Sequence, residues 1–395
     1  NGLKIRVSLV RFLEKPLKNS PNFSRHPFRE VFLLYIDNLI MLKILKKMLY
    51  IISVLLSLLI VGIVLFLNTP KFGKLPSGER LKRIEASPNY KNGKFVNLEH
   101  TPQLTSDKSF IQSLYEYLFK KAKSSKPTTK VPAEKTNLSN IPNNSMVWFG
   151  HSSYFIRLDD KNLLIDPVFN EASPLFFMVK PFDAEYNYST NDIPNIDLLI
   201  ITHDHWDHLD YKAIKKLKGR ISKILCPLGV GSHLEYWGFS PEQITELDWD
   251  EETSLLDMKI TCLPTRHFSG RGLLPTKTLW GSFMLQAQDK TVYVGGDSGY
   301  GKHFSRIGAQ FPNIDFAILE NGQYDEDWKH IHTQPYELPK VMKELGAKLY
   351  FTGHNSKFEL AKHSWQEPLE TIKKIQETEP EIHLLTPKIG RVEAF

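Results

Sequence analysis

The sequence predicts an α/β protein in which two β-sheets pack together, are covered by helices, and are preceded by one N-terminal transmembrane helix. Three observations support this prediction. An uncharged run of twenty residues, 48–67, lies in the N-terminal part of the chain. Short apolar stretches recur after residue 145, and several are apolar at both alternating positions, as in strands buried on both faces. Between them lie stretches whose apolar residues have helical spacing.

Residues 48–67 predict a membrane anchor. At 1.5 Å per residue, twenty residues span about the 30 Å hydrocarbon core of a bilayer. Lys43, Lys46 and Lys47 precede the run, so the positive-inside tendency places that flank in the cytoplasm and the following domain on the non-cytoplasmic side. A cleaved signal peptide is the first alternative, but its apolar segment is usually roughly 7 to 15 residues long and NTPKFGK offers no small-residue cleavage site. A buried core helix is the second.

The sequence around Met41 predicts where translation begins. The chain begins with Asn1, whereas Met41 stands just ahead of the three lysines. A start at Met41 would give an ordinary signal anchor. Residues 1–40 are therefore expected to be an upstream reading of the frame, and no function is assigned to them.

Composition and charge disfavour two classes of protein. Residues 1–47 contain ten Lys and Arg against three acidic residues, so the rest of a chain of net charge +6 carries −1. Nucleic-acid proteins, ribonucleases included, usually need positive charge on the working domain, so a nucleic-acid partner is not expected. Cys226 and Cys262 are too few for a disulfide framework and are expected to be buried thiols.

The chain of 395 residues is expected to divide into four segments. Residues 110–121 have the apolar spacing of a helix, expected to pack in the core, with a membrane surface as the alternative. Residues 123–136, KSSKPTTKVPAEKT, are typical of a solvated linker, which predicts a boundary near residue 140. The four segments are a basic N-terminal segment, 1–47, the anchor, 48–67, an extension with the linker, 68–140, and the main α/β domain, 141–390.

The main domain is predicted to alternate strands with helices. The predicted strands are 146–149, 154–158, 162–165, 198–201, 221–225, 258–263, 282–287, 291–294, 316–319 and 348–351. The predicted helices are 211–217, 231–237 and 336–345. Both kinds of element are short, which suits two sheets covered by helices.

The stretch ITHDHWDHLD, 201–210, follows one of these strands and carries the densest group of metal-binding side chains. Three imidazoles on one short loop repel one another once protonated, so their natural partner is a cation. His203 and His205 are two positions apart and could hold one ion, whereas the adjacent Asp207 and His208 suit a second. Imidazole and carboxylate ligands favour zinc, and manganese or iron are also admissible. A histidine-rich surface loop without a metal is the alternative.

A two-metal site needs further ligands, and they should come from turns after other strands. His267 in ITCLPTRHFSG, Asp297 in TVYVGGDSG and His354 in KLYFTGHNS each follow a strand-like run closely. Each alone could be structural, but their shared position makes them candidate ligands. A competing nucleotide motif, GDSGYGKH at 296–303, has His303 where a P-loop has the Mg²⁺-binding Ser or Thr, so nucleotide binding is not expected.

These motifs resemble the metallo-β-lactamase superfamily, whose fold is a four-layer αββα sandwich. More narrowly, residues 95–370 resemble the branch that contains N-acyl-phosphatidylethanolamine-hydrolysing phospholipase D and L-ascorbate 6-phosphate lactonase-like proteins. The most selective matching segments are ELDWDEE (246–252), LWGSF (279–283) and GDSGYG (296–301). The others are GKFVN (93–97), VWFGHSSYFIRLDDKNLLIDPVF (147–169), ITHDHWDHLDY (201–211), CPLGV (226–230), RHFSGRGLLPTKTLWGSF (266–283), HTQPYEL (332–338) and GHNSKFELAKHSWQEP (353–368).

The resemblance implies two zinc ions. The first would be held by His203, His205 and His267, the second by Asp207, His208 and His354, and both by Asp297. Asp166 in LLIDP matches a carboxylate behind the metal loop, where it would orient a ligand histidine. His151 in GHSS is a weaker candidate, because core packing explains it equally well.

The resemblance also implies hydrolysis of a phosphodiester by a hydroxide that bridges the two metals, whose charge lowers the pKa of the shared water. Asp204 would accept or pass its proton, and His332 would contact the substrate phosphate or protonate the leaving group. The expected substrate is an N-acyl-phosphatidylethanolamine-like lipid, which the anchor would keep near. The alternatives are hydrolysis of a soluble phosphodiester or sugar-phosphate lactone, and a non-catalytic, membrane-tethered binding protein. No oligomeric state is predicted.

Overall fold

The computed structural model describes residues 27–106, 108–109, 112, 115–116 and 119–395. The chain divides into two units, Asn1–Thr69 and Pro70–Phe395. This division lies next to the predicted end of the anchor at residue 67, and the boundary near residue 140 stays a prediction. Val131 and Ala133, inside the predicted linker, are buried and form β-bridges with Ala184 and Ile389. Two small apolar side chains spaced by two residues present one face to the domain, which is enough to pack this segment against it.

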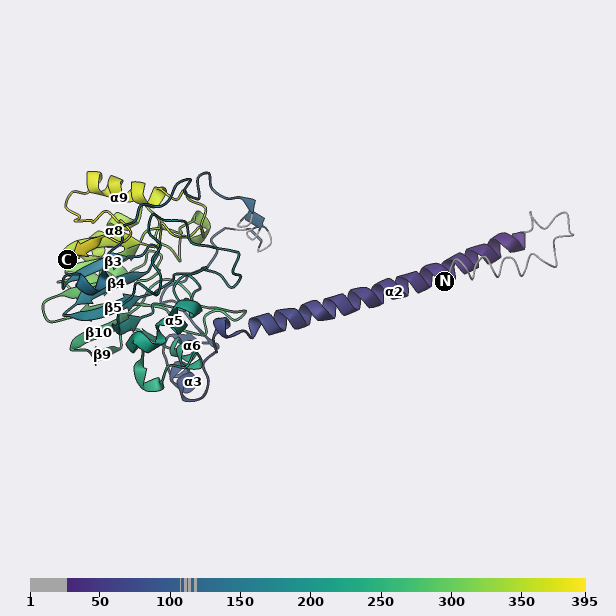
Figure 1. Cartoon of the computed structure of the whole chain (residues 1–395), viewed down its shortest axis with the longest axis horizontal. Coiled ribbons are helices and arrows are strands. Elements are labelled where there is room, and N and C mark those ends of the chain that lie inside the picture. The colour runs from purple at the N-terminus through teal and green to yellow at the C-terminus, as the bar shows by residue number, and fades with distance from the viewer. Residues whose placement is uncertain (1–26, 107, 110–111, 113–114, 117–118) are drawn as a thin grey trace. The chain divides into compact units, whose positions relative to one another are not determined.

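The first unit is dominated by one long helix, α2 (Pro27–Leu67). Figure 1 shows α2 as one continuous helix. Its 41 residues would extend about 60 Å, roughly twice the thickness of a hydrocarbon core. The stretch Glu30–Leu67 is long and apolar enough to cross a membrane, with a mean hydropathy of 2.9 in its most apolar part, none of which is buried. The prediction of a long apolar N-terminal helix is confirmed, and the alternative of a buried core helix is wrong.

The first sheet of the compact unit Pro70–Phe395 has seven strands in the order β15-β3-β4-β5-β6-β7-β8. Their bounds are β3 (Ser145–Trp148), β4 (Tyr154–Leu158), β5 (Lys161–Ile165), β6 (Ile196–Ile200), β7 (Ile221–Pro227), β8 (Ile244–Leu247) and β15 (Val392–Ala394). Pairing is antiparallel from β15 to β5 and parallel from β5 to β8.

The second sheet has six strands in the order β14-β13-β12-β11-β10-β9. Their bounds are β9 (Glu252–Leu255), β10 (Met258–Leu263), β11 (Ser282–Gln286), β12 (Thr291–Val294), β13 (Phe316–Glu320) and β14 (Leu349–Gly353). Pairing is antiparallel from β9 to β12 and parallel from β12 to β14. A separate pair, β1 (Tyr90–Lys91) and β2 (Lys94–Phe95), precedes both sheets.

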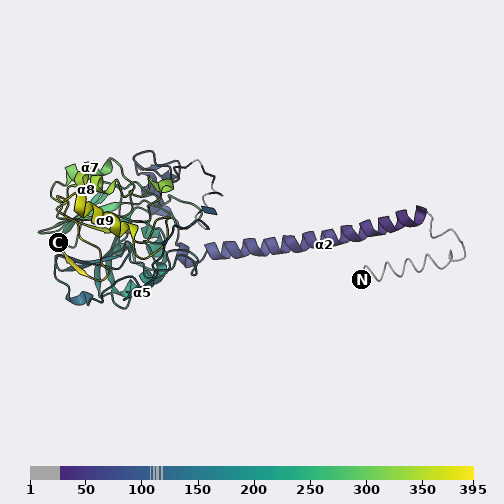
Figure 2. The ribbon, with the colours of Figure 1, turned by 90° about the horizontal axis from the view of Figure 1, so that it is seen from above.

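Helices cover the sheets. They are α3 (Gly78–Glu85), α5 (Tyr211–Leu217), α6 (Gly231–Tyr236), α7 (His303–Gln310), α8 (Leu338–Leu345) and α9 (Glu367–Thr378), with short 3-10 turns at Pro70–Phe72, Leu138–Asn140, Lys218–Arg220, Pro241–Gln243 and Glu326–Trp328. Figure 2 shows α7, α8 and α9 together on one side of the unit and α5 on the opposite side.

The core lies between the sheets, with a second apolar layer under α7–α9. Ile156 and Phe283 come from different sheets and belong to one buried cluster. Tyr293 of β12, Met342 of α8 and Ile372 of α9 belong to the second. Removing a buried aromatic ring from such a core costs about 3–5 kcal/mol, so this packing fixes the positions of the strand ends. The predicted α/β fold of two packed sheets covered by helices is confirmed.

Each predicted strand and helix of the main domain is present, with ends that differ by no more than two residues. The sequence missed β1, β2, β8, β9, β15 and the helices α3, α7 and α9. The predicted helix 110–121 lies partly outside the described residues. Of those described, Tyr115 and Phe119 are helical but 56% and 70% exposed, so these two rings are not in the core as expected.

Candidate metal centre

The candidate residues of both sheets lie where strands end. β10, β12, β13 and β14 run in the same direction in the second sheet, as do β5 and β6 in the first. Each therefore delivers the residues that follow it to one edge of its sheet. The residues delivered are Asp166 after β5, residues 203–208 after β6, His267 after β10, Asp297 after β12, Glu320 at the end of β13 and His354 after β14.

The loop 201–210, which carries several candidate ligands, is held by hydrogen bonds at its C-terminal end and along its length. At the C-terminal end, Asp210 caps α5 and its Oδ1 accepts hydrogen bonds from the backbone N–H groups of Lys212 and Ala213 at 2.9 and 3.1 Å. The buried guanidinium of Arg271 donates to three carbonyl oxygens of the loop, at 2.7 to 3.3 Å. Loop ligands fixed in this way keep their geometry without a bound ion.

One group of ligand atoms is formed by three imidazoles. Nε2 of His203 lies 2.9 Å from Nδ1 of His205, and Nε2 of His267 lies 3.2 Å from the same atom. Nδ1 of His267 donates to the carbonyl of Ile331 at 2.8 Å, which leaves its Nε2 with a lone pair facing the group. Three nitrogen atoms within 4.8 Å of one another suit a single cation.

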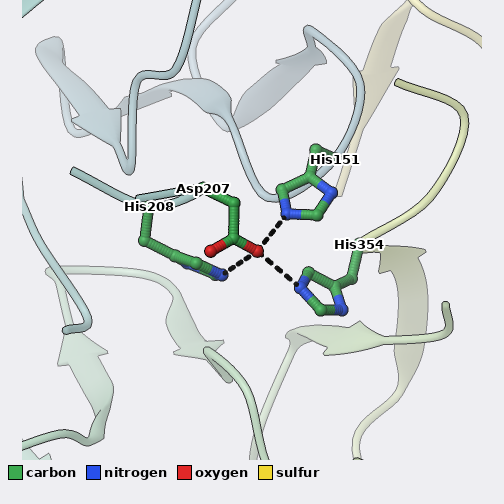
Figure 3. Close-up of side chains that lie close together, drawn as sticks. All are labelled: His151, Asp207, His208 and His354. Carbon is green, nitrogen blue, oxygen red and sulfur yellow. Dashed lines mark hydrogen bonds and ion pairs between the residues drawn. The ribbon is translucent and has the colours of Figure 1, made fainter. Parts of the chain in front are cut away.

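A second group lies beside the first and is formed by His151, Asp207, His208 and His354. Figure 3 shows the three imidazoles turned toward the carboxylate of Asp207. The distances to its Oδ2 are 2.9 Å from Nε2 of His151, 3.7 Å from Nε2 of His208 and 3.5 Å from Nε2 of His354. This is a mixed nitrogen and oxygen set, which suits zinc, manganese or iron.

Asp297 lies between the two groups. Its Oδ2 is 3.9 and 3.7 Å from Nε2 of His203 and His267, and 3.2 and 3.1 Å from Nε2 of His208 and His354. Oδ1 of Asp297, Nε2 of His208 and Nε2 of His354 are buried and have no hydrogen-bond partner. Buried polar atoms without partners are costly, so atoms that converge in this way fit a pair of cations.

The two groups differ in their electrostatics. Burial lowers the pKa of His203 and of His267 well below the usual value, so both rings are neutral. Burial also opposes protonation of His354, but the charge of Asp297 outweighs it and raises the pKa of His354 to about 10. Against the same burial, Asp297 and Asp207 raise the pKa of His208. The carboxylates thus hold protons where a cation would otherwise sit.

Asp166 lies behind the loop, where the sequence predicted it. Its Oδ1 accepts a hydrogen bond from the backbone N–H of Thr202 at 2.8 Å, and its Oδ2 accepts one from the Thr202 hydroxyl at 2.6 Å. Oδ2 also lies 2.8 Å from Nδ1 of His208. With Nδ1 held in this way, Nε2 of His208 faces Asp207 and Asp297.

Asp204 is not brought into the cluster. Its Oδ1 accepts a hydrogen bond from the backbone N–H of Gly270 at 2.6 Å, and its Oδ2 accepts one from the hydroxyl of Thr278 at 2.9 Å and lies 3.0 Å from Nε2 of His233. Burial opposes ionisation, but the hydrogen bond and charge of His233 outweigh it and lower the pKa of Asp204 to about 2. Because both oxygens are occupied away from the ligand atoms, the arrangement argues against the predicted proton transfer by Asp204.

His332 reaches the centre from another loop. With Asp207, His267, Asp297 and His354 it lines a cavity of about 260 Å³. Gln103, Leu104, Phe268, Trp328 and Leu360 complete much of the wall. The rings of His332 and His354 lie 5.3 Å apart and nearly parallel. The structure therefore places His332 beside the two groups of ligand atoms, where the sequence predicted it.

Sequence reasoning missed Glu320 and undervalued His151. Glu320 ends β13, and its Oε2 lies 2.8 Å from Nδ1 of His332. The available signal was a carboxylate directly after the apolar run FAIL, the pattern used for Asp297. The φ of His151 is +55°, in the left-handed region, and its backbone N–H and C=O bond Asn355 and His354, which aims the ring at Asp207.

The comparisons with known proteins agree with this geometry. Residues 161–355 match the beta-lactamase superfamily domain. An uncharacterised protein of Mycobacterium tuberculosis is 34% identical over 304 residues, which cover 75% of this chain and 81% of that protein. N-acyl-phosphatidylethanolamine-hydrolyzing phospholipase D 1 of Caenorhabditis elegans is 28% identical over 221 residues, 51% of this chain and 60% of that protein.

A solved structure shows the same fold. It is a possible metal-dependent hydrolase from Veillonella parvula, with a TM-score of 0.51 and 16% identity, covering 64% of this chain and 100% of that chain. The chain belongs to the metallo-β-lactamase superfamily of metal-dependent hydrolases. The family and the four-layer αββα sandwich predicted from the sequence are thereby confirmed.

Proposed function

We propose that the protein is a membrane-anchored dinuclear metal hydrolase, a phosphodiesterase of the phospholipase D type that acts on N-acyl-phosphatidylethanolamine-like lipids. One observation carries the proposal. Oδ2 of Asp297 lies within 3.9 Å of Nε2 atoms from His203, His208, His267 and His354. A single carboxylate shared by imidazoles from three loops is the arrangement expected of a bridge between two ions.

The proposed ligand sets follow from the two groups. The first ion would be held by His203, His205 and His267, the second by Asp207, His208 and His354, and both by Asp297. Zinc is proposed on the donor set, and manganese or iron would fit the same atoms. Asp166 behind His208 and the carbonyl of Ile331 behind His267 fix which ring nitrogen is offered to the ion.

When bound, two ions would activate a water molecule and offset the charge on the phosphoryl oxygens. The protein's own contribution includes His332, whose Nδ1 is held by Glu320 so that Nε2 faces the cavity. In the imidazolium form, that atom can donate to a phosphate oxygen or to the departing alkoxide. Phe268, Trp328 and Leu360 in the same wall exclude water from the reacting group.

Three observations support the substrate class: the size of the cavity, the apolar helix α2 and the similarity to a phospholipase D. A cavity of about 260 Å³ fits a phosphodiester head group but not a whole diacyl lipid, so the chains must remain outside it. The long apolar helix α2 would keep the compact unit at a lipid surface. The C. elegans relative hydrolyses N-acyl-phosphatidylethanolamine, as its name says. These three points favour a lipid over a soluble diester.

The test uses the purified full chain in lipid vesicles. Metal content is measured by elemental analysis, and turnover is measured on three substrates: N-acyl-phosphatidylethanolamine, bis-p-nitrophenyl phosphate and a lactone. Asp297→Asn should lose metal and all turnover, because it removes the charge that both ions share. The matched control is Asp289→Asn, in the exposed turn between β11 and β12, which should behave as the unaltered protein.

Each outcome distinguishes one possible function from another. Turnover of the lipid supports the proposal, whereas turnover of only the soluble diester or only the lactone assigns a different substrate. Two bound metal ions with no turnover of any substrate would indicate a binding protein. Fewer than two ions per chain would contradict the dinuclear centre.

The side of the membrane is a further part of the proposal. Lys43, Lys46 and Lys47 before the apolar stretch favour a cytoplasmic N-terminal flank and a non-cytoplasmic compact unit. Protease added to right-side-out membrane vesicles should then digest the compact unit. Protection of the unit until the vesicles are opened would reverse the assignment.

A further inference from the structure

Lys71 joins two loops that are far apart in the sequence. Its Nζ donates a hydrogen bond to the carbonyl of Pro174 at 2.5 Å, and its own carbonyl accepts from Nη2 and Nε of Arg271 at 3.0 and 3.1 Å. We call residues 173–178 and 270–275 the two apolar loops. Both are therefore fixed directly beside the same residue.

The tips of the two apolar loops carry large side chains that have no place in the core. Phe176 and Phe177 are 69% and 59% exposed, and Leu273 and Leu274 are 78% and 55% exposed. The rings of Phe176 and Phe177 contact each other edge to face with centroids 5.3 Å apart. Paired apolar residues exposed together on neighbouring loops mark an interaction surface more often than single ones do.

The chain connectivity indicates what the two apolar loops contact. Lys71 follows Leu67, the last residue of α2, by four positions. Since an extended chain covers at most about 3.6 Å per residue, Lys71 lies within about 14 Å of the end of the proposed membrane span. Whatever contacts Lys71 must therefore lie close to the bilayer surface.

We propose that the two apolar loops insert into the surface of the lipid bilayer beside the anchor and seat the metal centre on it. The proposal rests on the proposed function, because it needs α2 to span the membrane. Phe and Leu side chains suit the boundary between head groups and acyl chains, and their contribution grows with the apolar area that they bury. A bilayer also accounts for two pairs of exposed residues at once.

The same loops lead to the metal centre. The Arg271 guanidinium lies 4.1 Å from the ring of Trp206, in the middle of the metal loop, while its Nη1 donates to the carbonyl of Asp204. Leu274 and His267 line one groove of about 770 Å³. A phosphodiester at the bilayer surface would thus reach the ligands along a groove of mixed polar and apolar lining, with Leu274 at one part of it and its chains still in lipid.

The test measures depth in the bilayer directly. The full chain is reconstituted in phosphatidylcholine vesicles after an environment-sensitive fluorophore has been attached to Phe177→Cys or Leu274→Cys, and quenching by spin-labelled lipids is recorded. The native thiols, Cys226 and Cys262, are buried and should not react. The control is Asp289→Cys, which lies at the opposite ends of β11 and β12 from the metal loops.

Quenching at positions 177 and 274, with none at 289, is the expected result. Equal exposure to water at all three positions would overturn the proposal. Energy transfer between labelled copies without lipid quenching would show that the loops pair two chains instead, which also overturns it. The measurement is repeated in the Asp297→Asn background, where hydrolysis is absent, so failed docking and failed catalysis can be told apart.

A second readout uses turnover. The double change Phe177→Asp and Leu273→Asp should reduce hydrolysis of vesicle lipid relative to bis-p-nitrophenyl phosphate by about tenfold or more, because charges do not enter the apolar boundary. Tyr336→Asp, which alters an exposed aromatic residue outside the two loops, should leave that ratio unchanged. An unchanged ratio in the double variant would contradict the proposal.

Discussion

Oε2 of Glu320 lies 2.8 Å from Nδ1 of His332, and this contact determines which ring nitrogen is directed toward the cavity. The other carboxylate oxygen accepts hydrogen bonds from the backbone N–H of Thr333 at 2.7 Å and of Ser298 at 3.1 Å. The carboxylate is therefore fixed before any substrate arrives. A ring held through Nδ1 leaves Nε2 available to the phosphate of the proposed substrate.

Glu320→Gln should lower kcat for the soluble diester by about 10–100-fold, because an amide nitrogen facing Nδ1 would turn the ring or change its tautomer. Metal content should stay near that of the unaltered protein. Glu344→Gln, which alters a partly exposed carboxylate bonded to Tyr300, is the matched control. If kcat were unchanged in Glu320→Gln, His332 would not act through this contact.

Metal affinity should rise with pH. The pKa of His354 is raised to about 10 and that of His208 is raised as well, so at neutral pH the second ion must displace protons from these two rings. Each proton released on binding makes affinity about tenfold tighter per pH unit below the pKa of the group. Competition with a fluorescent chelator at pH 6, 7 and 8 measures this slope, and a slope of zero would contradict it.

Asp204→Asn should act on stability rather than on proton transfer. Replacing the buried carboxylate weakens three hydrogen bonds, which should lower the free energy of unfolding by about 2 kcal/mol, measured by urea denaturation. The decrease of kcat at acidic pH and its decrease at basic pH should both be retained. Asp257→Asn, in an exposed turn, is the control. Loss of either decrease in the Asp204→Asn variant would restore the proton-transfer role.

In the unaltered protein, the free energy of unfolding should depend on pH through Asp204. The pKa of Asp204 is lowered in the folded state to about 2, from an ordinary value near 4. Its contribution, roughly 2 kcal/mol, is therefore present above pH 4 and is lost as the pH falls from about 4 to about 2. Asp204→Asn should show a shallower loss of stability over this range.

His354→Asn and His151→Asn should differ in metal content. Both residues have positive φ, +67° and +55°, and asparagine tolerates this region well, so backbone strain is matched between the variants. His354→Asn removes a ligand and should leave about one tightly held ion per chain. His151→Asn should retain two ions with affinity for one of them weakened by about 10–100-fold. Identical stoichiometry in both variants would mean that His151 is itself a ligand.

Much of the fold was accessible from the sequence, because strands buried on both faces leave runs such as Leu198–Ile201 that need no knowledge of their neighbours. The strands that were missed have weaker patterns. β9 alternates between exposed and partly exposed residues, and β15 has three residues. The segment 123–136 looked solvated because its two anchoring residues, Val131 and Ala133, are outnumbered by Lys, Pro, Ser and Thr.

The sequence by itself determined which candidate ligands the chain offers: three imidazoles and a carboxylate on one loop, and His267, Asp297 and His354 after other strands. It could do so because donor type and position after a strand are local properties of the chain. Only the tertiary structure decided that Asp204 forms its hydrogen bonds with Gly270, Thr278 and His233. It also placed Glu320 beside Nδ1 of His332. Finally, it brought Lys71 into hydrogen-bond contact with both apolar loops. These outcomes depend on which strand lies beside which and on the direction of each side chain, and both are set by long-range packing between the two sheets.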